Sequence, residues 1–308
     1  MAPLGTQTPE EILKVGLMIC HYTVVEQARY KPENLQYEFN IFFGSYSRVY
    51  AAMWNDLVTS TDPAIQLDGK DQTLANLRAF LRSFFFLRHY PTIPTMARFF
   101  RIGKTACKGN AVWYWINKVH CLREKKIIWK ERWLDPNSEK FNISVDGVHC
   151  KIQEPKHETW SKNPKYYSHK NNTSGLNYEV AISVVDGHCC WVNGPFPAGR
   201  NDISIYYEAD GLRDKMLTCP GKRAIADLGY RGKEVGKTIS TPSSHDSPAL
   251  RKYKSRNRAK QETFNGRIKN FHVLKETFRH DLGHHKAAFD VCCIAVQYQL
   301  ETGNPLFS

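Results

Sequence analysis

The sequence predicts an α/β domain behind a helical N-terminal region. Up to about residue 130, apolar residues recur at intervals of three and four, the spacing of one face of an α-helix. From about residue 140 the period changes to two in several β-branched runs, which is typical of strands. A strand, a hairpin, a helix, a strand, a loop and a helix then follow, and this order is an α/β layer pattern.

The N-terminal region, residues 1–130, is expected to be mostly helical. Its periodic runs are EEILKVGLMICHYTV, EFNIFFGSYSRVYAAMW and TLANLRAFLRSFFFLRHY. Within about 78–125, a short helix, a Gly-containing turn and a longer helix indicate a helix-turn-helix. Lys104 and Lys108, early in that longer helix, are expected to bind DNA. Ordinary helical packing explains the same pattern, so both interpretations stay open.

The second region, residues 131–308, is expected to form the α/β domain. Its strand runs are NISVDGVHCKI, NYEVAISVVDG and HCCWVNG, and the last two are joined at Asp186-Gly187, a hairpin turn signal. A helix is predicted over ISIYYEADGLRDKM and a strand over KRAIADLGY. A long helix is predicted from about Ser255 to Val273, after a polar loop.

The charge balance predicts a polyanionic partner. Lys and Arg number 43 against 30 Asp and Glu, a net charge of +13 at pH 7. Nucleic acid is the obvious partner for such a surplus, although a basic protein without a polyanionic partner is the simpler alternative. Nine cysteines without C-x-x-C spacing, no signal-peptide pattern and no membrane-length apolar run predict an intracellular chain without membrane contact.

Three acidic residues indicate a metal-dependent site. Asp146 and Asp227 each end a short apolar run, where a strand would present a carboxylate at its tip, and Glu262 lies on a basic helical stretch. Three carboxylates brought together repel one another unless divalent cations lie between them, and such oxygen ligands suit Mg²⁺ or Mn²⁺. Two ions of this kind are the usual apparatus of phosphodiester cleavage.

Each acid also has a purely structural interpretation. The sequences around Asp146 and Asp227 are common in turns. Glu262 shares its helix face with Arg258 and Lys269, so a surface salt bridge to Arg258 is the simpler explanation. The preceding run RKYKSRNRAK, six of whose ten residues are basic, favours a phosphate-binding face instead. The opposite face carries the apolar residues expected to face the core, Phe264, Ile268 and Phe271.

Four motifs occur in one order between Ser144 and Phe271. VDGVHCKIQEP carries the first Asp, GPFPAGRNDISIY contains Asn201 and Asp202, IADLGYRG carries the second Asp, and SRNRAKQETFNGRIKNF carries the Glu. This series resembles the DDE superfamily endonuclease domain of PIF/Harbinger transposases, which are related to the bacterial IS5 group. The 35-residue separation from the second Asp to the Glu is also the spacing familiar from DDE recombinases.

The resemblance implies an RNase H-like fold, a mixed sheet flanked by helices. It implies that Asp146, Asp227 and Glu262 are the catalytic residues and the ligands of two Mg²⁺ or Mn²⁺ ions. The implied reaction is cleavage of DNA at terminal inverted repeats, followed by strand transfer into a target site. Asn201 and Asp202 are expected to support this site. The basic residues predicted to contact DNA phosphates are Arg256, Arg258, Arg267, Lys269, Lys170 and Arg200.

The chain departs from the family pattern at several positions. Ala198-Gly199 stands for Pro-Gly, and Asn201 replaces a His, so no proton transfer is expected there. Asn265 is an extra residue before Gly266. None of these departures changes the three acids.

Two rival functions stay open at this point. The first is a domesticated transposase that acts as a DNA- or chromatin-binding protein, and the second is an RNase H-type nuclease without strand transfer. The resemblance also leaves open whether a Myb-like DNA-binding partner or a second copy of the chain takes part. A nuclear location is expected, or a cytoplasmic one for a bacterial source.

Overall fold

The chain forms two compact units in its computed structural model. The structure describes residues 3–103, 109–129, 140–155, 163–232 and 235–307. The first unit comprises residues 1–124, 270–274 and 287–304. The second unit comprises residues 125–269, 275–286 and 305–308. Residues 287–304, which the sequence analysis grouped with the α/β domain, thus lie in the helical unit.

The first unit is helical, as predicted. Its N-terminal helices are α1 (Pro9–Ile19), α2 (Val24–Arg29), α3 (Pro32–Phe43), α4 (Ser47–Thr59), α5 (Leu74–His89), α6 (Ile93–Phe99) and α7 (Gly109–His120). Aromatic packing holds them together: the rings of Trp54, Phe80 and Trp115 lie with their centroids 5.6 to 5.8 Å apart. The helix-turn-helix stays a prediction, because Lys104 and Lys108 lie outside the described residues.

Two polar contacts explain why the C-terminal helix α13 (His285–Glu301) lies largely in the helical unit. The hydroxyl of Tyr298 donates to Asp56 on α4 at 2.6 Å. The fully buried carboxylate of Asp290 accepts from His120 on α7 at 2.9 Å. Both bonds join residues far apart in sequence, so local periodicity did not reveal them. The short helices α8 (Arg123–Lys126) and α12 (His272–Lys275) lie where the chain passes between the units.

The second unit is built on a mixed sheet. Its strands are β1 (Phe141–Lys151), β2 (Tyr167–Ser168), β3 (Thr173–Ser183), β4 (Cys189–Pro197), β5 (Arg223–Ile225) and β6 (Ile239–Ser240). The strand order is β4-β3-β1-β5-β6, with the two-residue β2 also paired to β3. Neighbours on the β3 and β4 side are antiparallel, and β5 and β6 run parallel to β1. The long strand β1 is therefore central.

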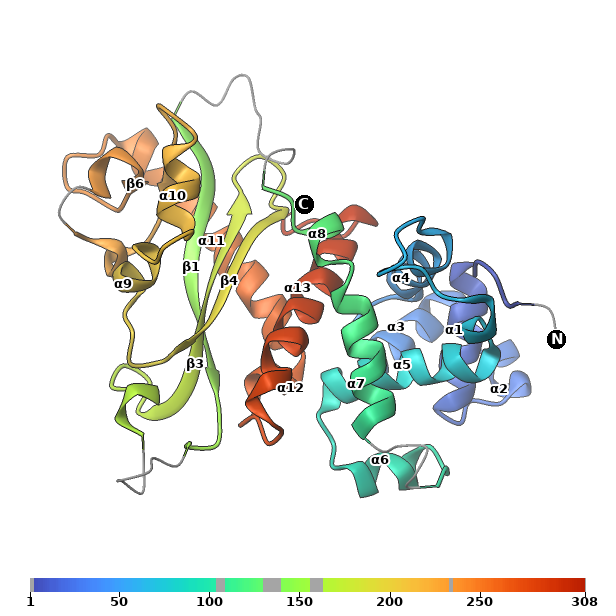
Figure 1. The fold of residues 1–308 in the computed structure, drawn as a ribbon. Helices are drawn as coiled ribbons and strands as arrows, with labels where there is room; N and C mark the ends of the chain where they lie inside the picture. Colours follow the sequence, from blue (N-terminus) through green and yellow to red (C-terminus); the bar gives the residue numbers. More distant parts are fainter. Residues whose placement is uncertain (1–2, 104–108, 130–139, 156–162, 233–234, 308) are drawn as a thin grey trace. The chain divides into compact units, whose positions relative to one another are not determined.

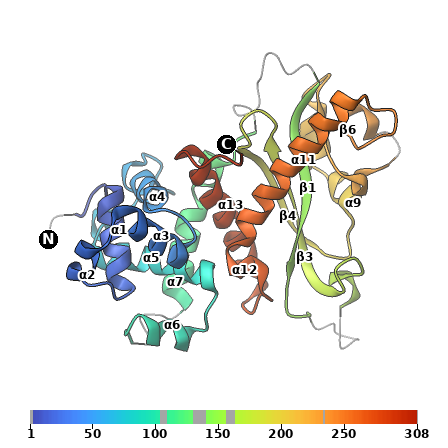
Figure 2. The same cartoon turned by 180° about the vertical axis from the view of Figure 1, so that it is seen from behind.

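Helices cover both faces of this sheet (Figures 1 and 2). On one face, α9 (Asp202–Tyr206) and α10 (Leu212–Leu217) pack on a buried apolar cluster that includes Ile143 and Val145 of β1. On the other face lies the long helix α11 (Pro248–Lys269), which buries Phe264 and Ile268 completely. The predicted mixed sheet flanked by helices is confirmed, and it is consistent with an RNase H-like fold.

Two helix predictions differ from the structure at their ends. Helix α11 begins at Pro248, before the predicted start near Ser255, because Ser247 accepts a hydrogen bond from the Leu250 amide and proline suits a first helical turn. The helix predicted over ISIYYEADGLRDKM is broken into α9 and α10. Between them, Asp210 adopts the left-handed conformation at a φ of 56°, which no continuous α-helix could accommodate.

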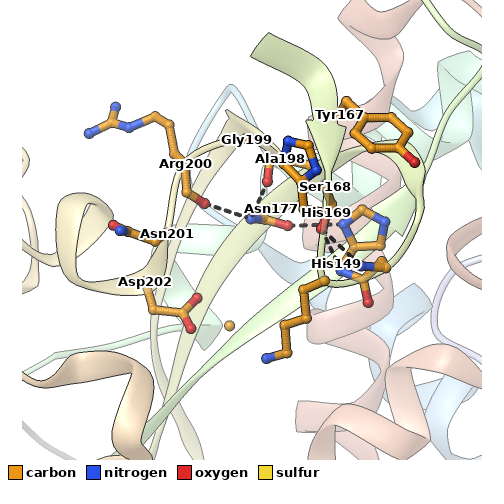
Figure 3. A pocket seen from close by; sticks show the side chains of 13 residues that line it. His149, Tyr167, Ser168, His169, Asn177, Ala198, Gly199, Arg200, Asn201 and Asp202 are labelled. Atoms are coloured by element: carbon orange, nitrogen blue, oxygen red, sulfur yellow. Dashed lines mark hydrogen bonds between the residues drawn. The ribbon is translucent and has the colours of Figure 1, made fainter. Parts of the chain in front are cut away.

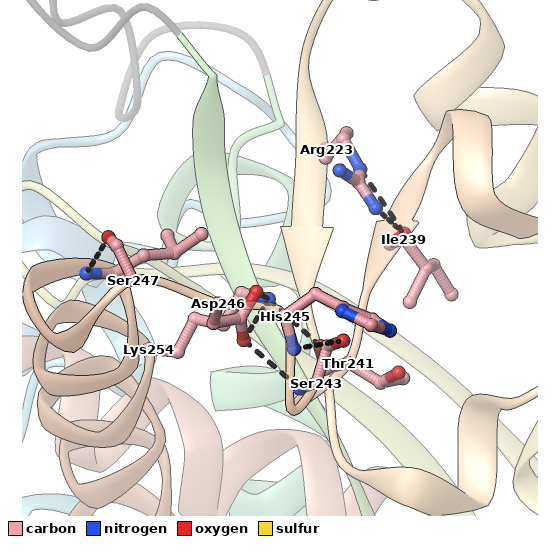
Figure 4. A network of polar contacts seen from close by, with 9 residues as sticks. Arg223, Ile239, Thr241, Ser243, His245, Asp246, Ser247 and Lys254 are labelled. Carbon is pink, nitrogen blue, oxygen red and sulfur yellow. Dashed lines mark hydrogen bonds and ion pairs between the residues drawn. The ribbon is translucent and has the colours of Figure 1, made fainter.

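A buried ion pair anchors the start of α11 (Figure 4). Lys254 donates to the Asp246 carboxylate at 2.8 Å and to the Thr241 carbonyl at 2.9 Å, and its side chain is 5% exposed. The loop that precedes α11 is thereby tied to the helix. Among the described residues, no helix is both long enough and apolar enough to span a membrane.

Replacement of Ile268 by Ala tests how firmly α11 is packed. Ile268 is fully buried, so the change should lower the free energy of unfolding by about 2–5 kcal/mol through lost burial and a residual cavity. Urea denaturation measures the loss. The matched control is Glu262→Gln on the exposed side of the same helix, which should stay within about 0.5 kcal/mol of the wild type. Equal losses in both variants would contradict this packing.

Candidate active site

Asp146 lies in the middle of the central strand. It pairs with Val180 of β3, so Asp146-Gly147 is extended strand and the turn interpretation is wrong for this dipeptide. The similar dipeptide Asp186-Gly187 does sit at the turn between β3 and β4, with Gly187 at a φ of 76°. The local sequences of the two Asp-Gly dipeptides are alike, so it is the pairing with a distant strand that makes one a strand segment and the other a turn.

The parallel pairing of β1 and β5 brings the first two acids together. Ser144 of β1 lies opposite Ile225 of β5. Asp146 and Asp227 each follow these partners by two residues, so both carboxylates come to the same end of the strand pair. Asp227 caps a short 3₁₀ turn, where its Oδ1 accepts from the Gly229 amide at 2.8 Å.

Glu262 reaches the same place from α11. Its side chain is exposed, and together with Asp146 and Asp227 it lines a cavity of about 200 Å³. The other residues that line this cavity, the acid cavity, are Ser144, Val145, Gly147, Lys170, Arg258 and Gln261. Three elements far apart in sequence thus bring the three predicted acids to one cavity.

Asp202, at the start of α9, approaches the acids from the opposite face of the sheet. Its carboxylate occupies the space where a side chain on Gly147 would lie. A Cβ atom on Gly229 would lie 2.7 Å from Asp202 Oδ2 and 3.0 Å from Asp227 Oδ1. Glycine at these two positions therefore lets the Asp202 carboxylate come close to β1 and to Asp227.

Burial and repulsion from neighbouring carboxylates raise the pKa of Asp146 and of Asp202. Burial, with Asp227 and Asp202 as negative neighbours, raises the pKa of Asp146 to about 6. Burial and the charge of Asp227 likewise raise the pKa of Asp202. The Lys170 ammonium opposes both shifts, and the Gly147 amide, which donates to Asp146 at 2.8 Å, opposes the shift of Asp146. The arrangement concentrates negative charge that a cation would stabilise.

The extra residue Asn265 turns out to touch the first acid. Its Nδ2 donates to Asp146 Oδ2 at 3.0 Å, and its Oδ1 accepts from Gln261 at 3.1 Å. Gln261 is almost fully buried, so this chain of hydrogen bonds orients the Asp146 carboxylate from α11. The departure that seemed to leave the acids unaffected therefore has a direct contact with one of them. The four-residue spacing of Gln261 and Asn265 indicates the hydrogen bond between these two side chains and gives no sign of the contact with Asp146.

Two predicted DNA-binding cations, Arg258 and Lys170, line the acid cavity. The structure describes both Arg258 and Glu262 and shows no ion pair between them, so the surface salt bridge is absent. Lys170, in the turn between β2 and β3, is exposed and acts electrostatically on Asp146 and Asp202.

Other predicted cations have partners within the protein. Lys269 donates to the His149 carbonyl of β1, and Arg267 donates to the Pro305 carbonyl. Arg200 forms an ion pair with Glu208. Arg256 is exposed on α11 and does not line the acid cavity. The predicted contacts of Lys104 and Lys108 with DNA stay predictions, since both residues lie outside the described part of the chain.

Asn201 has a structural role that explains its residue type. It is the N-cap of α9, and its side-chain oxygen accepts from the Ser204 amide at 3.0 Å. Asparagine is among the best N-cap residues, and this bond fixes the start of the helix that carries Asp202. Asn201 therefore fixes the backbone where its neighbour Asp202 begins α9, and its support of the site stays a prediction.

Sequence reasoning missed Glu179, a carboxyl group buried beneath the site. Glu179 lies on β3 opposite Gly147, is 1% exposed, and accepts from Trp191 Nε1 at 3.1 Å. Burial raises its pKa to about 8, and the charge of Asp202 adds to the shift. Its signal in the sequence was a single acid within the apolar run NYEVAISVV.

One comparison with known proteins gives a match. Residues 145–297 match the family model described as DDE superfamily endonuclease. The match supports a DDE transposase family. Neither the curated proteins nor the solved structures contain a match to the chain. The matched segment includes Asp146, Asp227 and Glu262 and leaves out the N-terminal helices. A DDE endonuclease domain supports a transposase- or nuclease-type function with DNA as substrate.

DDE endonucleases generally use divalent metal ions, and the oxygen donors of the acid cavity fit Mg²⁺ or Mn²⁺ chemically. Among the residues that the structure describes, no three His, Cys, Asp or Glu side chains form a group ready to hold a metal ion.

Glu179→Gln tests whether the buried carboxyl is protonated. Its pKa in the folded chain, about 8, exceeds the ordinary value of 4.5, so the unfolded chain releases this proton first as the pH rises. The wild type should lose stability from about pH 4.5 to 8, whereas Gln cannot titrate and still accepts from Trp191. Thermal melts should show the variant gaining in Tm over the wild type between these pH values. A difference that is constant with pH would contradict a protonated Glu179.

Proposed function

We propose that this protein is a DNA transposase of PIF/Harbinger type, which cuts and joins DNA at terminal inverted repeats by two-metal-ion phosphodiester chemistry. The observation that carries the proposal is the cavity lined by Asp146, Asp227 and Glu262 within the segment that matches DDE endonucleases. These three residues are the proposed metal ligands and catalytic residues. The nucleus is the proposed site of action in a eukaryotic source.

The proposed roles follow from what each side chain touches. Asp146 is held by Asn265 and by the Gly147 amide, so its carboxylate keeps one orientation while substrate enters. Arg258 and Lys170 line the cavity and would bind the phosphates beside the scissile bond. Asp146, Asp227 and Glu262 would hold the divalent ions, whose positive charge would supply Lewis-acid activation of the attacking oxygen and stabilisation of the leaving one.

The remaining basic residues divide by their contacts. Lys269 and Arg267 already donate to backbone carbonyls, so in this proposal they fix α11 and do not hold DNA. Arg256 is exposed and extends the phosphate-binding surface along the helix. A Myb-like partner and a homodimer remain predictions from the family resemblance.

Asp146→Asn tests the chemistry of the site. One ligand oxygen loses its charge without a change of shape, so Mg²⁺-dependent DNA cleavage should fall by more than about 100-fold. Affinity for DNA should change little, since phosphate contacts dominate it. A nicking assay on supercoiled plasmid measures cleavage, and strand-transfer products separate a transposase from a nuclease that cuts without joining.

The control for this variant is Asp186→Asn. It makes the same substitution in the other Asp-Gly dipeptide of the domain, at the β3–β4 turn. The variant should cleave DNA at the wild-type rate. It should unfold more easily, because Asp186 loses its ion pair with His188. Wild-type cleavage by Asp146→Asn would remove Asp146 from the mechanism.

Arg258→Ala tests the phosphate contact. If Arg258 binds a phosphate, its loss should make the slope of log K against log[salt] shallower by about 0.9 on duplex DNA. Fluorescence anisotropy over a series of salt concentrations, in EDTA, measures the slope. Lys269→Ala is the control on the same helix, because its ammonium donates to the His149 carbonyl. Lys269→Ala should melt at a lower temperature and keep the wild-type slope. A shallower slope for Lys269→Ala and an unchanged slope for Arg258→Ala would mean that Lys269, and not Arg258, binds the phosphate.

A further inference from the structure

A second cavity adjoins the acid cavity, and the three acids do not line it. Its volume is about 250 Å³, and it shares Gly147 and Lys170 with the acid cavity. Figure 3 shows Tyr167, His149 and His169 on one side of it and the segment leading into α9 on the other. Pockets for drug-sized ligands measure roughly 300–1,000 Å³, so this cavity suits a smaller unit.

The lining combines three kinds of chemistry. Aromatic rings come from Tyr167 and His169, which meet edge to face with their centroids 5.2 Å apart. Amide groups come from Asn171 and Asn201. A cation comes from Lys170, which is exposed and has no ion-pair partner within the described part of the chain. Ring faces stack on bases, amides bond base edges and cations bind phosphates, so the combination matches a nucleotide.

The walls of the cavity are fixed by hydrogen bonds of their own. In the β2–β3 turn, Asn171 Nδ2 donates to Ser168 Oγ at 2.9 Å. Across the cavity, Asn177 Nδ2 donates to the Arg200 carbonyl at 3.0 Å, and Asn177 Oδ1 lies 3.1 Å from His149 Nδ1. Because Asn177 already donates through its nitrogen, His149 carries the proton in that second bond. A pocket that is already formed loses little entropy when it binds a ligand.

We propose that this cavity, the nucleotide pocket, holds one unstacked nucleotide of the DNA strand that is cut. The proposal rests on the proposed function, because Lys170 lines both cavities and its ammonium would bind the phosphate that joins the pocket to the acids. A base inside a duplex is stacked and paired, so it cannot enter without being extruded. The pocket therefore favours single-stranded or unpaired DNA next to the scissile phosphate.

Tyr167→Ala tests the pocket by binding alone. A labelled oligothymidylate is titrated with the full chain in EDTA, so that no cleavage occurs, and a labelled duplex is titrated in parallel. Loss of one stacking ring should weaken oligothymidylate binding about tenfold, with a change of less than about twofold on the duplex. Tyr167→Phe keeps the ring and should bind as the wild type does. His169 is exposed, so His169→Ala should fold normally, and it should likewise weaken binding to oligothymidylate more than binding to duplex.

The matched control is Tyr166→Ala. Tyr166 is the preceding residue, does not line the nucleotide pocket, and lies under the Lys165 ammonium. The Tyr166→Ala variant should leave the ratio of the oligothymidylate affinity to the duplex affinity unchanged. Equal losses on both DNA forms with Tyr167→Ala, or an unchanged ratio with both Tyr167→Ala and His169→Ala, would overturn the pocket.

The outcome is independent of the nuclease proposal. Selective loss of oligothymidylate binding supports the pocket even where Asp146→Asn leaves cleavage intact. Cleavage that depends on Asp146, together with an unchanged ratio of affinities, keeps the nuclease and removes the pocket.

Discussion

Repulsion among carboxylates beside the centre of the sheet is the constraint that shapes the second unit. Asp146, Asp202 and Asp227 influence one another electrostatically, and Asp146 and Asp202 are also substantially buried. Burial, to which the neighbouring negative charges add, raises the pKa of Asp146 to about 6. Such a cluster costs folding free energy, so the surrounding structure has to offset the cost.

The offsets come from backbone and side-chain donors placed around the acids. The amides of Gly147 and Gly229 donate to Asp146 and Asp227, and Asn265 donates to the free oxygen of Asp146. The same two glycines leave room for the carboxylate of Asp202. Donors and space are therefore provided by the same short segments, and a larger residue at either glycine would disturb both.

Helix α11 is held at several points along its length, which matters because it carries Glu262, Arg258 and Asn265. Near its start, Lys254 binds Asp246 and the Thr241 carbonyl. At its end, Lys269 donates to β1. A helix fixed in this way presents Glu262, Arg258 and Gln261 to the acid cavity in one register.

The sequence by itself determined the helical first region, the α/β class of the second, and the residue types of the site. Apolar periodicity and turn residues are local, so they indicate helices and strands directly, and the order of the motifs singled out Asp146, Asp227 and Glu262. Tertiary structure decided what depends on partners distant along the chain: that Asp146-Gly147 lies within a strand, that Asn265 binds Asp146, and that Lys269 is tied to β1. Burial of Glu179 belongs to the same group. Strand pairing and helix packing create these environments, and the spacing of residues along one segment carries no record of them.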